Sequence, residues 1–443
     1  MLDQMMRIGW FTPFSTRSAI ARFSRAVTAE LSQLAQVELC HFDRGPVLKT
    51  DVPVVKFRSA EAVSADALKR YDIAVYNFGN CLPYHSEIYR LSQRCPGICI
   101  LHDFVMHHFF AAYYLEHVHD PGAYALLMEK LYGEDGKARQ GARVWESDDV
   151  VRFPLFEEAA RGARGVVTHS EFFRERVSAA FVGPVRRIPL AYDALEPAAG
   201  PARAALGIPD NVALVVTLGH VKPNKRIEDV LAALAGIGPT GKRVTYAIIG
   251  ACPAAYQRQL AGLAEASGLG ERVRLLGRVP DQTLRSYVDR ADICVNLRSP
   301  ALEGASASLI EEMLAAKPVI VSDTGFFREL PDDCVVKVTL ERDGDLAAQL
   351  KRLVTDARAR TETGARARQF AAGEFRADRY AREILDFAWE VRAASPLLNL
   401  ADRMGGELER MGVTSEAKIV DTVAQELHGL FCGRKTNSPL RRA

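Results

Sequence analysis

Short apolar runs alternate with longer amphipathic stretches through the first half of the chain. Between the runs, residues 18–35 and 171–181 place apolar side chains at steps of three and four, the spacing of one helix face. Strands that alternate with helices are typical of a parallel sheet, so the first half is predicted to be an α/β domain. The runs expected to form its strands are 6–11, 37–42, 52–57, 73–78, 97–103, 165–170 and 185–190.

The same alternation begins again after a turn-rich stretch with many Ala and Pro residues at 191–211. Helix-like spacing recurs in residues 281–291 and 306–316. The sequence therefore predicts two Rossmann-like domains in tandem, joined by a linker. The second set of predicted strands covers 213–219, 244–250, 273–279, 293–298, 318–323 and 334–338.

The carboxyl-terminal part is predicted to be helical at first and then irregular. Residues 375–394 form a strong amphipathic pattern, followed by a looser tail around 403–412, a short helical stretch and a frayed end at 433–443. Two open parallel sheets bind ligands at their carboxyl edges, so function is expected in a cleft between the domains. The predicted divisions are an acceptor-side domain at 1–195, a linker at 196–212, a donor-binding domain at 213–375 and a crossing helix with tail at 376–443.

Composition and charge narrow the class of protein. The 443 residues exceed what one core supports, and the chain is 48% apolar and 25% charged, as in ordinary globular proteins. A net charge of +2 argues against nucleic acid as a partner. No apolar run is long enough to span a membrane, and the first residues lack a signal-peptide pattern, so a cytoplasmic location is expected. Eight scattered cysteines are interpreted as reduced thiols rather than metal ligands.

Two carboxylates flank the crossing from the predicted strand 293–298 to the helix expected near Ser306. Glu303 lies in the turn, and Glu311 lies one and a half turns into the helix, with seven residues between them. Carboxylates suit the hydroxyl pairs of a sugar or a ribose. The spacing alone leaves open that Glu311 and its neighbour Glu312 lie on a solvated helix face. The free N–H groups expected to attract a diphosphate at this helix terminus belong to Ala305, Ser306 and Ala307.

Residues 291–325 resemble the hallmark of the GT-B glycosyltransferases of family 4, in which two glutamates stand seven residues apart after an apolar strand. The flanking text matches as well, with Glu-Gly before the helix, small residues at its end, then Pro-Val-Ile and a Gly-containing loop. The resemblance implies an α/β, GT-B fold with two Rossmann-like domains facing a central cleft. It also implies retaining transfer from a nucleotide diphosphate sugar, with Glu303 orienting the sugar and Glu311 holding the ribose.

Residues 215–234 resemble the family's strand, glycine, loop, lysine and helix that bind the donor pyrophosphate. Gly219 ends the strand, and Lys225 stands where the family places a lysine. Its ammonium would neutralise the leaving diphosphate, which gains negative charge as the glycosidic bond breaks. His220 replaces the usual arginine, and a surface lysine is the alternative interpretation of Lys225.

Residues 11–27 are similar to the family's loop after the first strand, which approaches the donor phosphates through a glycine. Ala19 stands at that place, so Ser18 and Ala19 are expected to be minor donor contacts. Helix capping by Ser15 or Ser18 explains the serines equally well. The loop with Gly277 and Arg278 corresponds to the loop in which the family holds the base through backbone groups. Backbone contacts leave little trace in the sequence, so the base is not identified.

The family places a histidine that faces the transferred sugar at the end of the strand 97–103, which corresponds to His102. Residues 76–89 resemble an element that makes Asn80 and His85 acceptor-side candidates. The aromatic stretch 104–115 is either a buried helix face, which is the default, or the lining of an acceptor groove or a lipid contact. The remaining histidines are interpreted as core or helix-face residues because the resemblance implies no metal; they are His107, His108, His117 and His119.

The resemblance implies that the acceptor attacks on the face that the diphosphate leaves, and that a donor phosphate oxygen takes the acceptor proton. No cofactor is implied, and the partners are the nucleotide sugar donor and a glycan or lipid-linked acceptor of bacterial polysaccharide or envelope synthesis. Three alternatives stay open. The first is a nucleotide-sugar epimerase. The second is a non-catalytic sugar-nucleotide-binding scaffold, which the replacements at His220 and Ala19 suggest. The third is a polymer-assembly partner with peripheral contact at the inner membrane face, supported by the basic residues 433–443.

Overall fold

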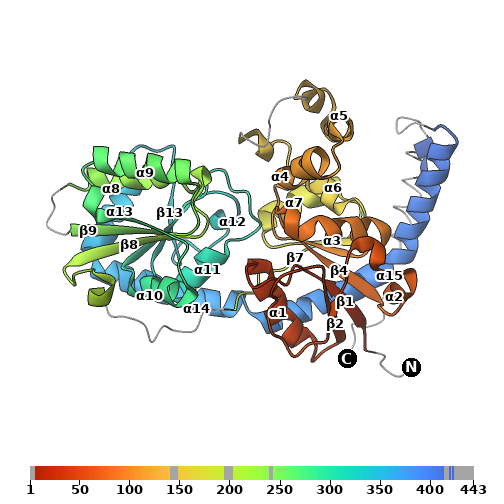
Figure 1. Ribbon diagram of the computed structural model, residues 1–443, viewed down its shortest axis with the longest axis horizontal. Helices are drawn as coiled ribbons and strands as arrows, with labels where there is room; N and C mark the ends of the chain where they lie inside the picture. Colours follow the sequence, from red (N-terminus) through yellow and green to blue (C-terminus); the bar gives the residue numbers. More distant parts are fainter. Residues whose placement is uncertain are drawn as a thin grey trace, which may run out of the picture.

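The computed structural model describes residues 5–139, 148–193, 203–238, 243–413, 419–420 and 422–423. The chain forms two lobes, each built on one parallel sheet (Figure 1). Every apolar run predicted as a strand contains one, so the predicted fold class is confirmed. The chain alternates strand and helix because each apolar run is buried in a sheet and each amphipathic stretch covers a face of it.

The first lobe contains a seven-stranded sheet in the order β3-β2-β1-β4-β5-β6-β7. Its central strand β4 is buried at all six positions. The strands are β1 (Arg7–Phe11), β2 (Gln36–His41), β3 (Val54–Lys56), β4 (Ile73–Phe78), β5 (Ile98–Leu101), β6 (Gly165–Thr168) and β7 (Val185–Arg187). The α-helices are α1 (Ala19–Leu31), α2 (Ala65–Lys69), α3 (Leu82–Arg94), α4 (His107–Ala112), α5 (Pro121–Ala138), α6 (Phe156–Ala160) and α7 (Glu171–Ala180).

The second lobe contains a six-stranded sheet in the order β10-β9-β8-β11-β12-β13. Its strands are β8 (Val212–Leu218), β9 (Arg243–Ile249), β10 (Val273–Gly277), β11 (Ile293–Asn296), β12 (Val319–Ser322) and β13 (Val336–Val338). Its α-helices are α8 (Ile227–Gly236), α9 (Ala254–Ala266), α10 (Asp281–Arg290), α11 (Ala307–Leu314), α12 (Gly325–Arg328), α13 (Asp345–Thr355) and α14 (Ala357–Glu374), and α15 (Ala377–Arg410) follows them in the chain. In both sheets the paired strands are parallel, so their carboxyl ends share one edge.

Helix α15 returns from the second lobe to the first, where it packs against α1 (Figure 1). A looser tail was expected at 403–412. That expectation is wrong for most of these residues, because α15 continues through Pro396 to Arg410. The helix is held beyond the proline by Arg164, which donates to Asn399 at 2.8 Å and pairs with Asp402 at 2.7 Å. The expected frayed end at 433–443 lies outside the described residues, as do residues 196–202 of the linker predicted at 196–212. The described part of that linker contains the short 3-10 helix Arg203–Leu206 and ends where β8 begins at Val212.

In the part of the chain that the structure describes, no helix is suited to span a membrane and the cysteines form no disulfide. None of the described helices is long and apolar enough to cross a bilayer. The seven described cysteines are free, and Cys40, Cys99, Cys294 and Cys334 are buried. Burial raises the pKa of the Cys334 thiol to about 11, which keeps that side chain protonated at neutral pH.

The loop after β9 depends on a glycine. Gly250 has φ of +149°, and a Cβ there would lie 2.0 Å from the carbonyl oxygen of Gly219 on the neighbouring β8 loop. We expect Gly250→Ala to lower the free energy of unfolding by about 3 kcal/mol, measured by urea denaturation. Gly262→Ala is the matched control, because a Cβ on that glycine in α9 meets nothing within 4 Å. The control should gain roughly 0.5–1 kcal/mol, and equal effects at the two sites would contradict the explanation.

Candidate active site

The predicted site residues follow strand ends that face each other across the two lobes. In the second lobe, the loop after β8 contains Gly219 and Lys225, and the loop after β11 contains Glu303. Helix α11 begins at Ala307, as predicted, and the side chain of its N-cap Ser306 accepts a hydrogen bond from Leu309 N. In the first lobe, His102 follows β5. The helix terminus, the lysine and the glutamate thus lie on one sheet edge.

Backbone hydrogen bonds join the two lobes at the predicted catalytic residues. Gly304 N donates to the carbonyl oxygen of His102 at 2.9 Å, and Phe104 N donates to that of Leu302 at 3.1 Å. Between these bonds, the backbones of Asp103 and Glu303 form an antiparallel bridge. A Cβ on Gly304 would lie 3.0 Å from the His102 oxygen, so the glycine permits this approach. The structure therefore brings the glutamate turn and the His102 strand end together.

Glu303 is held as an anion by a buried arginine that the sequence analysis did not single out. Its Oε1 accepts from Arg298 Nε at 2.5 Å. Burial by itself raises the pKa of Glu303, but the charges of Arg298 and Lys225 outweigh it and lower that pKa. Arg298 is fixed in turn, because its side-chain Nη1 donates to Asn296 Oδ1 at 2.8 Å and its backbone N–H donates to Ser322 Oγ at 2.9 Å. The carboxylate is thus ionised and positioned before any ligand binds.

Lys225 is buried rather than on the surface, with 5% of its area exposed. This contradicts the alternative interpretation of a solvated loop lysine. Its Nζ donates to the carbonyl oxygen of Leu218, and a Cβ on Gly219 would lie 3.1 Å from that Nζ. Burial and the nearby Arg298 charge lower the pKa of Lys225 well below its usual value, although the carboxylates of Glu303 and Glu312 act in the opposite direction.

Helix α11 carries two buried glutamates, so the alternative of a solvated helix face is wrong. Glu311 is 1% exposed and Glu312 is fully buried. Glu311 Oε1 pairs with Arg285 Nη1 of α10 at 2.5 Å, and the same carboxylate contributes to the raised pKa of the half-buried Tyr192 hydroxyl. The contact of Glu311 with a ribose stays a prediction. A ribose bound there would share the Glu311 carboxylate with Arg285.

Glu312 is a second feature that the sequence analysis did not assign. Its Oε2 accepts from Asn296 Nδ2 at 2.9 Å, while its Oε1 has no hydrogen-bond partner among the described residues. Burial raises its pKa to about 7, against the opposing effects of Asn296 and Lys225. Asn296 therefore links the Glu312 carboxyl to Arg298, and through Arg298 to Glu303.

Positive groups gather at the ends of β8 and β10. The pKa of the exposed His220 is lowered, first by partial burial and then by the charges of Lys222, Lys225 and Arg278. This shows that all three cations lie near the imidazole, although Arg278 comes from a different loop. Such a cluster favours an anion, and a diphosphate is an anion of suitable charge. The donor contacts expected of His220, Gly219 and Arg278 stay a prediction.

His102 does not offer a free ring nitrogen. Its Nε2 lies 3.1 Å from Asn77 Oδ1, and its Nδ1 lies 3.2 Å from His169 Nε2. Burial lowers the pKa of His102 well below its usual value, and His169 contributes in the same direction. A direct contact between this imidazole and a sugar hydroxyl requires one of these two hydrogen bonds to be exchanged. The predicted role facing the sugar therefore stays a prediction.

The other predicted contacts in the first lobe have structural partners. Ser18 caps α1 and accepts from Ala21 N at 3.4 Å, and Ala19 begins that helix. Asn80 Oδ1 accepts from Phe109 N at 2.7 Å. His85 is buried, and its Nδ1 lies 3.1 Å from the Asn77 carbonyl oxygen. These bonds favour capping for Ser18 and support within the lobe for Asn80 and His85.

The aromatic stretch at 104–115 is mainly core, which was the default expectation. Phe104, Phe109 and Phe110 are at most 3% exposed. His107 is buried beside them, and its Nε2 lies 2.7 Å from the Tyr124 hydroxyl. Among the described residues, no group of His, Cys, Asp or Glu side chains has the arrangement of a metal site.

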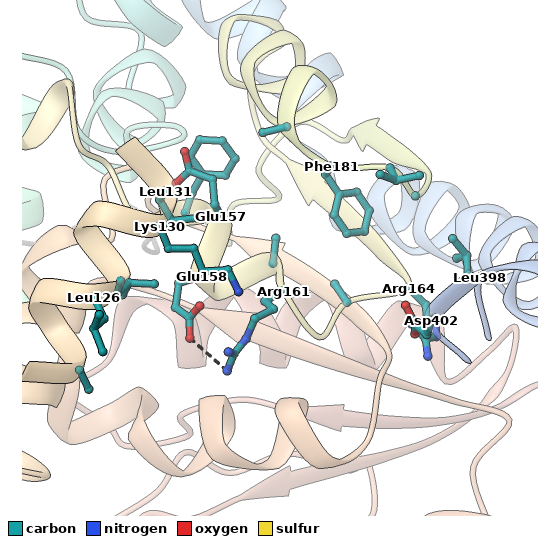
Figure 2. Close-up of a pocket in the computed structure, with 18 of the residues that line it drawn as sticks. Leu126, Lys130, Leu131, Glu157, Glu158, Arg161, Arg164, Phe181, Leu398 and Asp402 are labelled. Carbon is teal, nitrogen blue, oxygen red and sulfur yellow. Dashed lines mark ion pairs between the residues drawn. The ribbon is translucent and has the colours of Figure 1, made fainter. Parts of the chain in front are cut away.

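A pocket of about 570 Å³ lies in the first lobe, apart from these residues (Figure 2). It is lined by side chains from α5, α6, the segment after α7 and α15, including Leu126, Lys130 and Phe181. The ion pair between Glu158 and Arg161, 3.1 Å apart, stands on its wall. None of the predicted site residues lines this pocket, so we do not assign it to the active site.

Three neighbours of the site were missed by sequence reasoning, although two left a signal. Asn296 and Arg298 stand two residues apart at the end of β11, so their side chains point to the same side. Polar residues at that spacing in an otherwise apolar strand indicate a shared function. His169 stands at the end of β6, on the same sheet edge as His102, but nothing in its local sequence predicts their contact.

Comparisons with known proteins agree with this geometry. Residues 201–370 match the protein family described as Glycosyl transferases group 1. Among curated protein sequences, none matches the chain. Sucrose-phosphate synthase from Thermosynechococcus elongatus is similar in structure over 88% of this chain and 100% of that one, with a TM-score of 0.63 and 17% identity.

Two further solved glycosyltransferase structures show the same arrangement. HepE from Anabaena, solved in complex with UDP-glucose, covers 87% of this chain and 100% of its own, with a TM-score of 0.62 and 18% identity. WaaG, a glycosyltransferase involved in lipopolysaccharide biosynthesis, covers 87% and 99%, with a TM-score of 0.56 and 14% identity. At these identities the likeness establishes the fold.

The fold and the facing strand ends define the class: this is a GT-B protein. Within that fold, residues 201–370 carry a group 1 glycosyltransferase domain.

Proposed function

We propose that the chain is a retaining, metal-independent hexosyltransferase that uses a nucleotide diphosphate sugar. The observation that carries the proposal is the pairing of a cation and an anion at one helix terminus. Lys225 lies close enough to Glu303 to lower the pKa of its carboxyl, and α11 begins four residues after that glutamate. Lys225 and the helix terminus stabilise a diphosphate, while the ionised Glu303 accepts hydrogen bonds from sugar hydroxyls.

In the proposed reaction, the bond between the anomeric carbon and the diphosphate oxygen breaks. The acceptor oxygen bonds to the same face of that carbon, and its proton passes to an oxygen of the departing diphosphate. Lys225 and the cations near His220 stabilise the charge that develops on the leaving group. Glu303 fixes the orientation of the sugar, and Glu311 holds the ribose beside Arg285.

The acceptor is proposed to be a glycan or a lipid-linked sugar of polysaccharide or envelope synthesis. The involvement of WaaG in lipopolysaccharide biosynthesis supports this class. The complex of HepE with UDP-glucose supports a uridine donor as the first to test. A cytoplasmic location, with peripheral contact at the inner membrane face, belongs to the same proposal.

A thermal-shift and hydrolysis panel tests the donor. UDP-glucose, UDP-N-acetylglucosamine, GDP-mannose and ADP-glucose are added at millimolar concentration, with and without EDTA. A ligand that binds only the folded cleft raises Tm, by an amount that grows with the logarithm of its concentration. We expect one nucleotide to raise Tm and one of its sugars to be hydrolysed slowly, with EDTA leaving both results unchanged.

The outcomes separate the proposed function from its rivals. A Tm shift without turnover in the presence of any glycan acceptor favours the non-catalytic sugar-nucleotide-binding scaffold. Retention is read from the anomeric configuration of the product by NMR, and an inverted product contradicts the proposed mechanism. If no nucleotide sugar raises Tm, the donor proposal is wrong.

A further inference from the structure

A chain of hydrogen bonds runs between two backbone carbonyl groups behind the predicted sugar site. Asn77 Nδ2 donates to the Phe11 carbonyl oxygen at 3.1 Å, and Asn77 Oδ1 lies 3.1 Å from His102 Nε2. His102 Nδ1 then lies 3.2 Å from His169 Nε2, and His169 Nδ1 lies 3.0 Å from the Ile188 carbonyl oxygen. The four contacts join β1, β4, β5 and β6 at their carboxyl ends and reach the residue after β7.

This chain is one proton short when both imidazoles are neutral. Its two ends are carbonyl oxygens, which only accept. Between them, the Asn77 amide supplies one donor and one acceptor, and each neutral imidazole of His102 and His169 does the same. Four contacts need four donors, and the neutral chain supplies three. Turning the amide of Asn77 or exchanging tautomers only moves the missing proton to another contact.

The surroundings keep the pair neutral in the ligand-free protein. His169 and Asn77 are at most 1% exposed. Burial, with Arg187 of β7 also contributing, lowers the pKa of His169 to about 4 despite its bond to the Ile188 carbonyl. His85 of α3 acts on His102 in the same direction.

The other groups around the pair carry little charge. Phe23 of α1 presents its ring to His102 with a centroid distance of 4.8 Å, and the Tyr380 ring of α15 lies 6.0 Å from that of His169. Asp103 is the nearest acid along the chain, and burial raises its pKa to about 6. Neither Asp103 nor the ionised Glu303 is among the charges that shift the pKa of His102 or His169, so neither acid stabilises a proton on the pair in the free protein.

A bound donor supplies an anion close by. The carbonyl oxygen of His102 accepts from Gly304 N, one residue from Glu303, so the pair lies directly behind the turn that is proposed to orient the donor sugar. We propose that His102 and His169 together take up one proton when the diphosphate donor binds, and that His169 is the positioning residue which completes the chain and fixes the His102 imidazole. This inference rests on the proposed function, because it needs an anionic donor in the cleft.

Proton uptake is measured by titration calorimetry in buffers of different ionisation enthalpy. UDP-glucose, GDP-mannose and ADP-glucose serve as probes, because their diphosphate diesters do not titrate near neutral pH. At pH 6.5 we expect the slope of binding enthalpy against buffer enthalpy to report net uptake, and donor affinity to rise as the pH falls. Asp103 and Glu312 also titrate in this range, so the comparison is always made against a variant at position 169.

Two variants separate the proton from the hydrogen bonds. In His169→Gln, one amide nitrogen carries two donors, so it satisfies both His102 and the Ile188 carbonyl without a charge. We expect this variant to take up about half to one proton fewer than the wild type and to keep kcat within about threefold. His169→Val loses the same uptake but leaves His102 unfixed, so its kcat falls roughly tenfold or more. His117→Gln, which changes an exposed histidine five residues after the end of α4, is the control and should match the wild type.

Three different results would each overturn a different statement. Binding of a probe with equal uptake in the wild type and in His169→Gln overturns this inference and leaves the proposed function standing. Equal kcat in the Gln and Val variants overturns the positioning role. If none of the probes binds to the wild type, the proposed function fails, and the inference that depends on it fails with it.

Discussion

Replacing Glu303 with glutamine is expected to lower kcat/KM by about two to three orders of magnitude. The variant keeps the shape of the side chain but removes the negative charge that Arg298 holds in place at 2.5 Å. An amide cannot accept two strong hydrogen bonds from sugar hydroxyls, and Arg298 is left buried with 5% exposure and no anion beside it. The measurement is donor hydrolysis, or transfer once an acceptor is known, together with Tm.

A matched control separates lost chemistry from lost stability. Glu158 is also a buried glutamate, 3% exposed, and it pairs with Arg161 at 3.1 Å far from the cleft. Glu158→Gln should lower Tm to a similar extent and leave kcat/KM within about twofold. Full turnover by the Glu303 variant, or an equal loss of activity in the control, would remove Glu303 from the proposed site.

The arrangement of both sheets was predictable because it follows from local patterns. Each strand of the described chain lies in an apolar run of four to eight residues bounded by polar or turn residues, and burial in a sheet removes such a run from water. The end of α15 was not predictable in this way. Its last turns are held by Arg164, which lies more than two hundred residues earlier in the chain.

The candidate site likewise contains residues that the local sequence indicates and residues that only the fold brings together. Glu303, Glu311 and Lys225 were found because they lie in one or two contiguous segments whose spacing resembles a known family. Arg298 was overlooked although it stands only five residues before Glu303, because the signal it leaves is no more than its spacing of two from Asn296 at the end of β11. The partners of His102 lie 25 and 67 residues away and meet it only because parallel strands align their carboxyl ends. Burial of Glu312 within an amphipathic helix is likewise a property of the packed structure.

The second large effect is expected at Lys225. In Lys225→Met, donor binding should weaken enough to abolish the Tm shift at millimolar nucleotide sugar, and turnover should fall by about a factor of a thousand. The charge of this lysine lowers the pKa of both Glu303 and Glu312. Its removal should therefore raise the pKa of Glu312 above about 7, so more of that carboxyl is protonated at neutral pH.

Lys317 is the matched control for that variant, since it is also a largely buried lysine that donates to backbone carbonyls, at 2.8 Å to Asp289 and 3.1 Å to Ala291. It lies just before β12, at the opposite end of the sheet from the strand ends that carry the site. Lys317→Met should lower Tm, because those carbonyl groups lose their donor, and yet retain the Tm shift with nucleotide sugar. A lost ligand response in both variants indicates general loosening of the lobe, whereas loss at Lys225 alone places the diphosphate beside its ammonium.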